Sequence, residues 1–169
     1  MKNMIKLIGI IAIIAAIGLG MTACEDPEED QTGHRYEVVD ESMTWSEASA
    51  YAKDKEGYLA VINNANEQTV VQNLMISEGN KNFYWLGGYR DDNTWKWQNG
   101  SKFEYTNWSR GQPDNYQGKE DKLMIMRIPN PRSPGAEAGK WDDIGADGLI
   151  AGEAYFDANN KGFIIEWDK

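Results

Sequence analysis

Five side chains with oxygen donors lie between residues 112 and 143, in a stretch that also contains a proline. They are Gln112, Asp114, Glu120, Asp142 and Asp143. Hard cations such as Ca2+ bind six to eight oxygen atoms, chiefly from carboxylates, amides and water. No histidine or cysteine lies in this stretch, which argues against a zinc site. The residue types predict a calcium site, and the alternative for acidic loop residues is simple solvation.

The same stretch resembles the sugar-binding loop of C-type lectin-like domains. Gln112-Pro113-Asp114 is similar to the family's sugar-selective loop, with Glu120 at a familiar spacing, and residues 141–143 (Trp-Asp-Asp) resemble its Trp-Asn-Asp strand. Upstream, residues 84–88 look like the family's Trp-Ile-Gly-Leu core motif, and residues 162–167 look like its closing strand. The resemblance covers about residues 35–169 and rests on the order and spacing of the motifs together.

The resemblance implies calcium-dependent binding of carbohydrate. The same set would hold the ion and contact the sugar: Gln112, Asp114, Glu120, Asp142 and Asp143. A cis bond before Pro113 would turn the side chains on either side of it toward one ion. The order Gln-Pro-Asp resembles the branch selective for galactose or N-acetylgalactosamine, in which Tyr116 would stack on the sugar. The alternative for Tyr116 is an ordinary loop tyrosine.

Some details of this implied site remain open. Asp142 stands where the family usually has Asn, which removes an amide donor to the sugar and adds a negative charge. We therefore expect stronger cation binding and altered sugar binding. Trp108 is expected in the core rather than at the sugar. A second calcium ion is conceivable between Asp91 or Asp92 and the residues Asn115, Glu120 and Asp121.

Two other functions are compatible with the sequence. The segments 129–139 and 144–161 are longer than is usual for the family, and inserted loops can form a surface for a protein partner without any sugar. A glycosidase would need two carboxyl groups at a set separation. Carboxylates that hold a metal are poor proton donors, so we expect no enzymatic activity and assign no catalytic residue.

The N-terminus is expected to be a lipoprotein signal peptide. Two lysines precede an apolar run over residues 7–21, which is short for a bilayer span of roughly 20 apolar residues and has the pattern of an export signal. Residues 21–24 (Met-Thr-Ala-Cys) resemble a bacterial lipobox. We expect cleavage before Cys24 and lipidation of its thiol, for example by palmitate. The alternative is an uncleaved anchor.

These expectations divide the chain into a signal peptide (1–23), an acidic tether (24–34) and a lectin-like domain (35–169). The domain would be displayed on a bacterial cell envelope, at the outer membrane or cell surface, anchored in the membrane through the lipid on Cys24. Loss of residues 1–23 removes two lysines and no acid, which leaves 15 basic and 27 acidic residues and a net charge of −12. Such a charge argues against nucleic acid as a partner.

Cys24 is the only cysteine, so no disulfide can form within the chain. By resemblance, the family's long disulfide would join the positions of Ala52 and Ile165, which are both apolar here. We expect packing to replace this bridge. His34, the only histidine, is expected to be exposed at the end of the tether.

The elements that would position the site form an α+β domain of the C-type lectin-like fold, with two helices, antiparallel strands and a long calcium-binding loop region. Thr44 with Glu47, and Asn64 with Glu67, are N-terminal capping patterns. They predict helices over 45–54 and 65–77, the second with Val70, Leu74 and neighbouring residues on its apolar face. Residues 107–118 lack periodicity and predict a long loop, which is often functional.

Strands are expected on both sides of this loop. Asn99-Gly100 predicts a hairpin turn between strands 95–98 and 102–105. The last strand is expected to pair with the first. The remaining predicted strands are 35–39, 58–62, 84–88, 122–128, 140–142 and 163–167.

Overall fold

A computed structural model describes residues 33–131, 137–149, 156–157 and 159–168. The expected signal peptide, Cys24 and most of the acidic tether lie outside these residues. Among the described residues, no helix is both long enough and apolar enough to cross a membrane. The elements are β1 His34–Val39, α1 Trp45–Asp54, β2 Tyr58–Leu59, α2 Ala65–Glu78, β3 Phe83–Asp91, β4 Thr94–Trp97, η1 Tyr116–Gly118, β5 Lys122–Met126, β6 Trp141–Ile144 and β7 Lys161–Asp168.

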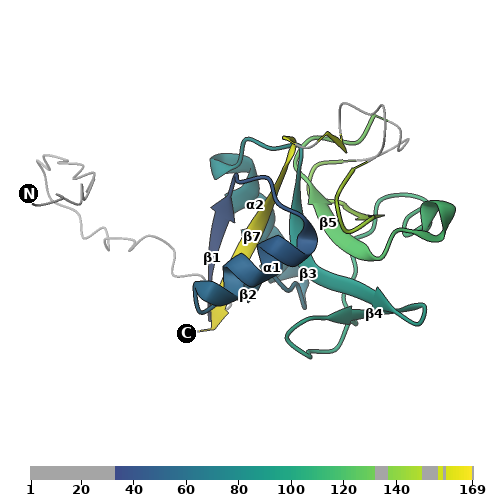
Figure 1. Ribbon diagram of the computed structural model, residues 1–169. Helices are drawn as coiled ribbons and strands as arrows, with labels where there is room; N and C mark the ends of the chain where they lie inside the picture. The colour runs from purple at the N-terminus through teal and green to yellow at the C-terminus, as the bar shows by residue number, and fades with distance from the viewer. Residues whose placement is uncertain (1–32, 132–136, 150–155, 158, 169) are drawn as a thin grey trace, which may run out of the picture.

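One sheet connects all of the described strands, in the order β1-β7-β3-β5-β6, with β2 beside β7 and β4 beside β3. The first and last strands pair antiparallel, as expected, so the two ends of the domain lie side by side (Figure 1). Five pairs of the described strands run antiparallel, as expected, and β3 and β7 run parallel, so the sheet is mixed. The α+β class is confirmed.

Both helices begin where the capping patterns predict. Thr44 accepts the backbone N–H of Glu47 at 3.3 Å, and the Glu47 carboxylate accepts the backbone N–H of Thr44 at 2.8 Å. Asn64 caps α2 in a similar way by accepting two backbone N–H groups. Helix α1 has the predicted bounds, and α2 extends one residue further than predicted.

The apolar face predicted for α2, with Val70, Leu74 and their neighbours, is only partly the buried face. Val71 and Met75 are fully buried, whereas Val70 and Leu74 are only partly buried. Polar contacts explain why Val71 and Met75 face the core more fully than Val70 and Leu74. Gln68, 5% exposed, donates to the carbonyl of Gly139 at 2.9 Å and accepts the indole N–H of Trp141 at 2.9 Å. Periodicity of apolar residues alone could not reveal a buried glutamine.

The predicted hairpin around Asn99-Gly100 was also wrong. β4 pairs with β3, and the turn between them lies at Asp92 and Asn93, which both have left-handed backbone angles. The described residues 102–105 form no strand. Phe103 instead packs against Trp97, with ring centroids 4.7 Å apart. Aromatic packing thus takes the place of strand pairing in this segment.

The remaining strand bounds differ by small amounts. β2 covers only two of the five predicted residues. Beyond it, Ala60 donates its N–H to the carbonyl of Ile164, but Val61 donates to the side chain of Glu166 rather than to a strand. β5 ends two residues early, whereas β3, β6 and β7 are longer than predicted.

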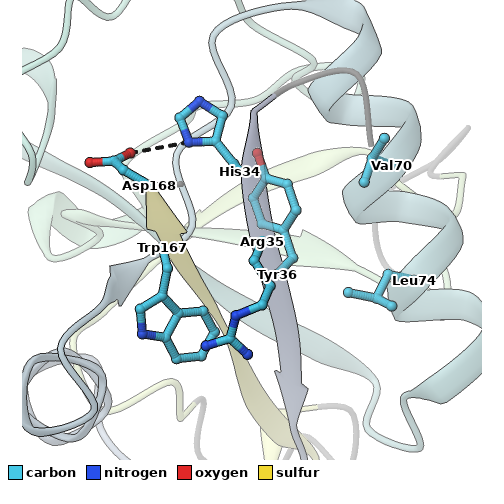
Figure 2. A pocket seen from close by; sticks show the side chains of 7 residues that line it. All are labelled: His34, Arg35, Tyr36, Val70, Leu74, Trp167 and Asp168. Atoms are coloured by element: carbon cyan, nitrogen blue, oxygen red, sulfur yellow. Dashed lines mark ion pairs between the residues drawn. The ribbon is translucent and has the colours of Figure 1, made fainter. Parts of the chain in front are cut away.

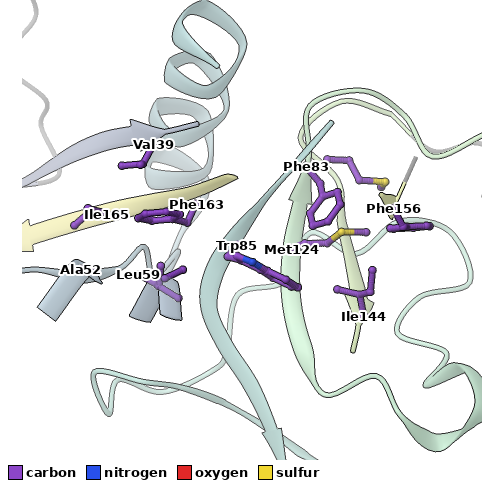
Figure 3. Packing of buried hydrophobic residues seen from close by; sticks show 12 residues of the cluster. Val39, Ala52, Leu59, Phe83, Trp85, Met124, Ile144, Phe156, Phe163 and Ile165 are labelled. Atoms are coloured by element: carbon purple, nitrogen blue, oxygen red, sulfur yellow. The ribbon is translucent and has the colours of Figure 1, made fainter. Parts of the chain in front are cut away.

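The core consists of two clusters of buried side chains, and Figure 3 shows one of them. In this cluster Ala52 and Ile165 are both fully buried, which agrees with the expectation that these two positions pack against apolar neighbours. Trp108 packs against the other cluster, as expected, with its ring centroid 5.8 Å from that of Trp141. This second cluster underlies the loop that carries the predicted site.

Candidate functional site

The loop between β4 and β5 is tied to strand β6. Trp141 donates its N–H to the carbonyl of Asn107 at 2.9 Å, and Ser109 donates its N–H to the carbonyl of Trp141 at 2.8 Å. β6 is in turn paired with β5, where Leu123 lies opposite Asp143. The carboxylate of Asp143 is therefore held on a sheet strand directly beside the loop.

The peptide bond before Pro113 is cis, as expected. Gln112 accepts the backbone N–H of Asp114 through its side-chain oxygen at 2.9 Å. Asp143 accepts the backbone N–H of Asp114 at 3.0 Å and that of Asn115 at 2.9 Å, one on each carboxylate oxygen. A single strand residue thus holds two successive residues of the loop.

Three carboxylates converge at this point. Oxygen atoms of Asp114, Glu120 and Asp143 all lie within 4.8 Å of one another. Asp143 is 2% exposed and Glu120 is 8% exposed, whereas Asp114 faces solvent. The cluster therefore has two buried ligands and one at the mouth, which suits an ion that must also reach an external ligand.

The electrostatics of the cluster favour a cation. Burial is the largest cause, and together with the neighbouring charges of Asp143 and Asp114 it raises the pKa of Glu120 to about 8, against the opposing hydrogen bond from the N–H of Tyr116. Burial also raises the pKa of Asp143, against two stabilising backbone N–H groups. Like charges at this distance resist ionisation, and a divalent ion relieves that repulsion. The donors are all oxygen atoms, which fits Ca2+.

The other predicted ligands lie around this cluster. Gln112 is partly buried and occupied with the Asp114 backbone. Asp142, 3% exposed, lies outside the group of three; its carboxylate is 3.5 Å from the amide nitrogen of Asn130. Burial raises the pKa of Asp142 to about 7. Its role as a ligand therefore stays a prediction.

Tyr116 lies in the η1 turn at the rim of the cluster. Its side chain is 57% exposed, and its backbone N–H donates to the carboxylate of Glu120 at 2.8 Å. The side chain is therefore accessible to an external ligand, and its role in stacking on a sugar stays a prediction.

The conceivable second calcium site is only partly assembled. Asn115 accepts the backbone N–H of Glu120 at 3.2 Å. Asp91, however, pairs with Lys96 at 2.7 Å, and Asp121 pairs with Lys122 at 2.6 Å. Lysine already neutralises these two carboxylates.

Sequence reasoning missed two residues next to the site. Arg90 donates from its guanidinium to the carbonyl of Glu120, and its backbone N–H donates to the carbonyl of Asp121 at 2.8 Å. Asn130 contacts Asp142, as described above. Neither belongs to a motif, and only the pairing of β3 with β5 brings Arg90 to the loop.

The comparisons with known proteins point to a single family. The model of the lectin C-type domain matches residues 41–148. The chain is 35% identical over 86 residues to perlucin of Haliotis laevigata, which covers 50% of this chain and 56% of perlucin. It is 38% identical over 78 residues to the galactose-specific lectin nattectin of Thalassophryne nattereri, which covers 44% of this chain and 49% of nattectin. The matches thus span about half the length of these relatives.

Solved structures agree with the fold. The carbohydrate-recognition domain of the mouse scavenger receptor C-type lectin superposes with a TM-score of 0.62 at 26% identity, over 82% of this chain and 92% of that domain. The C-type lectin CEL-I from Cucumaria echinata superposes with a TM-score of 0.63 at 23% identity, over 84% of this chain and 96% of that chain. The fold described above is therefore the one that these lectin domains adopt.

Proposed function

The chain belongs to the C-type lectin domain family, and we propose that it binds galactose-type carbohydrate through a calcium ion held by the loop beside β6. Members of this family are carbohydrate-binding proteins rather than enzymes, in agreement with the expectation that the chain is not an enzyme. The observation that carries the proposal is the convergence of Asp114, Glu120 and Asp143 within 4.8 Å beside the cis peptide.

The proposed ligands are these three carboxylates, completed by Gln112 and Asp142. When bound, Ca2+ supplies a positive centre that can take two neighbouring hydroxyl groups of a sugar as further oxygen ligands. The side chains around it would orient the sugar: carboxylate oxygens accept from its hydroxyls, and the Gln112 amide donates. The ring of Tyr116, which is 57% exposed, would cover an apolar face of the sugar.

Galactose is favoured over mannose by two observations. The sequence order Gln112-Pro113-Asp114 resembles that of galactose-selective lectins. A relative that is 38% identical over 78 residues is described as galactose-specific. Asp142 in place of the usual Asn adds a carboxylate near the proposed ion, which should strengthen the binding of the ion and alter the binding of the sugar.

The proposal also includes the place of the domain in the cell. Residues 1–23 would direct export, and Cys24 would carry the lipid that anchors the chain to a bacterial envelope. His34 begins β1 at the same end of the domain where β7 finishes, and the predicted site lies at the far end of the sheet (Figure 1). An anchor that joins the domain at His34 would leave the loop region facing outward.

Sugar-affinity chromatography tests this function. The full chain in mild detergent should be retained on galactose-agarose in millimolar Ca2+, elute with EGTA, and pass through mannose-agarose. Asp143→Ala should abolish retention. Glu37→Ala, at an exposed carboxylate of β1, should bind like the wild type, and circular dichroism verifies that each variant is folded.

Two results would overturn the proposal. Retention that survives in Asp143→Ala would refute the site. A folded wild-type chain that binds Ca2+ but neither sugar would refute the proposed binding of galactose-type sugars and favour the alternative, a lectin-like domain that binds a surface protein.

A further inference from the structure

We propose that His34, Glu166 and Asp168 form a second metal site, selective for Zn2+ or another divalent ion that prefers imidazole, at the end of the domain opposite the calcium loop. His34, expected to be exposed, is in fact partly buried: its side chain is 25% exposed. The three residues each place one potential ligand atom within 4.8 Å of the others.

Strand pairing positions the cluster. His34 is the first residue of β1 and lies opposite Asp168 of β7, while Glu166 precedes Asp168 by two residues. Residues two apart on a strand point to the same face, so both carboxylates flank the imidazole. The His34 Nδ1 atom lies 3.0 Å from Glu166 Oε1 and 3.1 Å from Asp168 Oδ1.

These distances are close to those of a tetrahedral zinc site. Zinc bonds of ~2.0–2.2 Å place neighbouring ligand atoms roughly 3.3–3.5 Å apart in a tetrahedron. The imidazole nitrogen is therefore within a few tenths of an ångström of the required separation from each carboxylate oxygen. A nitrogen ligand suits Zn2+, Cu2+ or Ni2+ and not Ca2+, so this site would differ in selectivity from the all-oxygen cluster in the loop.

Neighbouring groups already orient the two carboxylates. Glu166 is 1% exposed, and its second oxygen accepts the backbone N–H of Val61 at 2.7 Å. The Tyr58 hydroxyl lies 3.0 Å from Glu166 Oε1 and 2.6 Å from Asp168 Oδ1. Hydrogen bonds from outside the ligand set are what hold metal ligands in place in known sites.

The cluster borders an open space. His34 and Asp168 line one part of a cavity of about 370 Å³, and Val70 and Leu74 of α2 line another (Figure 2). Asp168 is 72% exposed, so an ion reaches the cluster from solvent without unfolding of the strands. Three protein ligands leave the fourth tetrahedral position for water or for a ligand from the cavity.

Calorimetric titration with Zn2+ tests the site. The untagged full chain in detergent is first saturated with Ca2+ so that the loop cluster is filled. The wild type should then bind one Zn2+ more than His34→Gln, which lacks the imidazole but keeps a similar size. Asp168→Asn should weaken zinc binding at least tenfold. Glu37→Gln, on the same strand as His34, should not change zinc binding.

Cobalt gives an independent readout. Co2+ added to the calcium-loaded wild type should develop the visible absorption of a tetrahedral ion, and His34→Gln should not. Equal Zn2+ stoichiometry in the wild type and His34→Gln would overturn the proposal. So would the absence of zinc binding by the wild type, which would leave the cluster as an ion pair of histidine with two carboxylates. Unchanged Ca2+ binding in His34→Gln shows that the variant is folded.

Discussion

The raised pKa of Glu120 makes the stability of the calcium-free protein depend on pH. Burial, with Asp114 and Asp143 close by, raises the pKa of Glu120 to about 8, whereas a glutamate in an unfolded chain titrates near ~4.3. Between these two values the folded state binds a proton that the unfolded state has released. The free energy of unfolding must therefore decrease as the pH rises through this window, and be greatest below it.

The size of the effect follows from linkage. One additional proton bound by the folded state changes the free energy of unfolding by ~1.4 kcal/mol per pH unit. From pH 5 to pH 7, Glu120 alone should cost about 2–3 kcal/mol of stability. In Glu120→Gln the side chain has the same shape, is uncharged at every pH and still accepts the N–H of Tyr116. The free energy of unfolding of this variant should therefore decrease with pH less steeply than that of the wild type, by ~1.4 kcal/mol per pH unit.

The free energy of unfolding of Glu120→Gln should still decrease somewhat as the pH rises. Burial raises the pKa of Asp142 to about 7 and that of Glu166 to about 7, and both act in the same direction as Glu120. The comparison between the wild type and Glu120→Gln, rather than either slope alone, therefore isolates the contribution of Glu120.

Urea unfolding in EGTA at pH 5, 6 and 7, with linear extrapolation to water, measures the two slopes. Glu104→Gln is the matched control, because that side chain is 77% exposed. At pH 7, Ca2+ at 100 times its Kd should add ~2.7 kcal/mol to the wild type and clearly less to Glu120→Gln. A wild-type stability that is constant or increases from pH 5 to pH 7 in EGTA would refute the reasoning, as would identical slopes in the two proteins.

Three further predictions concern the frame and the rim of the site. Thr44→Ala removes the side-chain cap of α1 and should cost ~1 kcal/mol in urea unfolding, whereas Thr44→Ser should restore it. Gly88→Ala would place a Cβ atom 2.6 Å from Leu123 and should cost ~1–3 kcal/mol; Gly145→Ala, whose Cβ meets nothing closer than 3.6 Å, should cost far less. Tyr116→Ala should weaken galactose binding about tenfold, or ~1.4 kcal/mol, with unchanged Ca2+ affinity by calorimetry, and Tyr116→Phe should bind like the wild type.

Local sequence patterns predicted the structure correctly where it depends on contacts between residues that are close in the sequence. The helix starts at Thr44 and Asn64 follow from side chains that satisfy backbone N–H groups, and the structure has both caps. Local sequence patterns gave a wrong prediction where the structure depends on packing against residues from another segment. The Asn99-Gly100 turn signal does not produce a hairpin, because Phe103 packs onto Trp95 and Trp97 instead of pairing as a strand.

The same distinction applies to the site. Spacing along the chain pointed to Asp114, Glu120 and Asp143, and the fold brings these three together. Spacing could not separate Asp143 from Asp142, because adjacent residues of a strand point to opposite faces and only the folded sheet shows which one faces the loop. Asp143 contacts the loop backbone, whereas Asp142 contacts Asn130, which comes from a segment without a recognisable motif.

The absence of a disulfide requires another means of joining the first helix to the last strand. Loss of a native bridge typically costs ~2–5 kcal/mol. By resemblance, the bridge would join the positions of Ala52 and Ile165. Both residues are fully buried together with Phe163, and complete burial of one isoleucine contributes about 1.5–3 kcal/mol. Six residues of β1 also pair with β7. Apolar burial and strand pairing are thus of the right size to offset the missing bridge. Because Cys24 is the only cysteine, no intramolecular disulfide contributes to this fold.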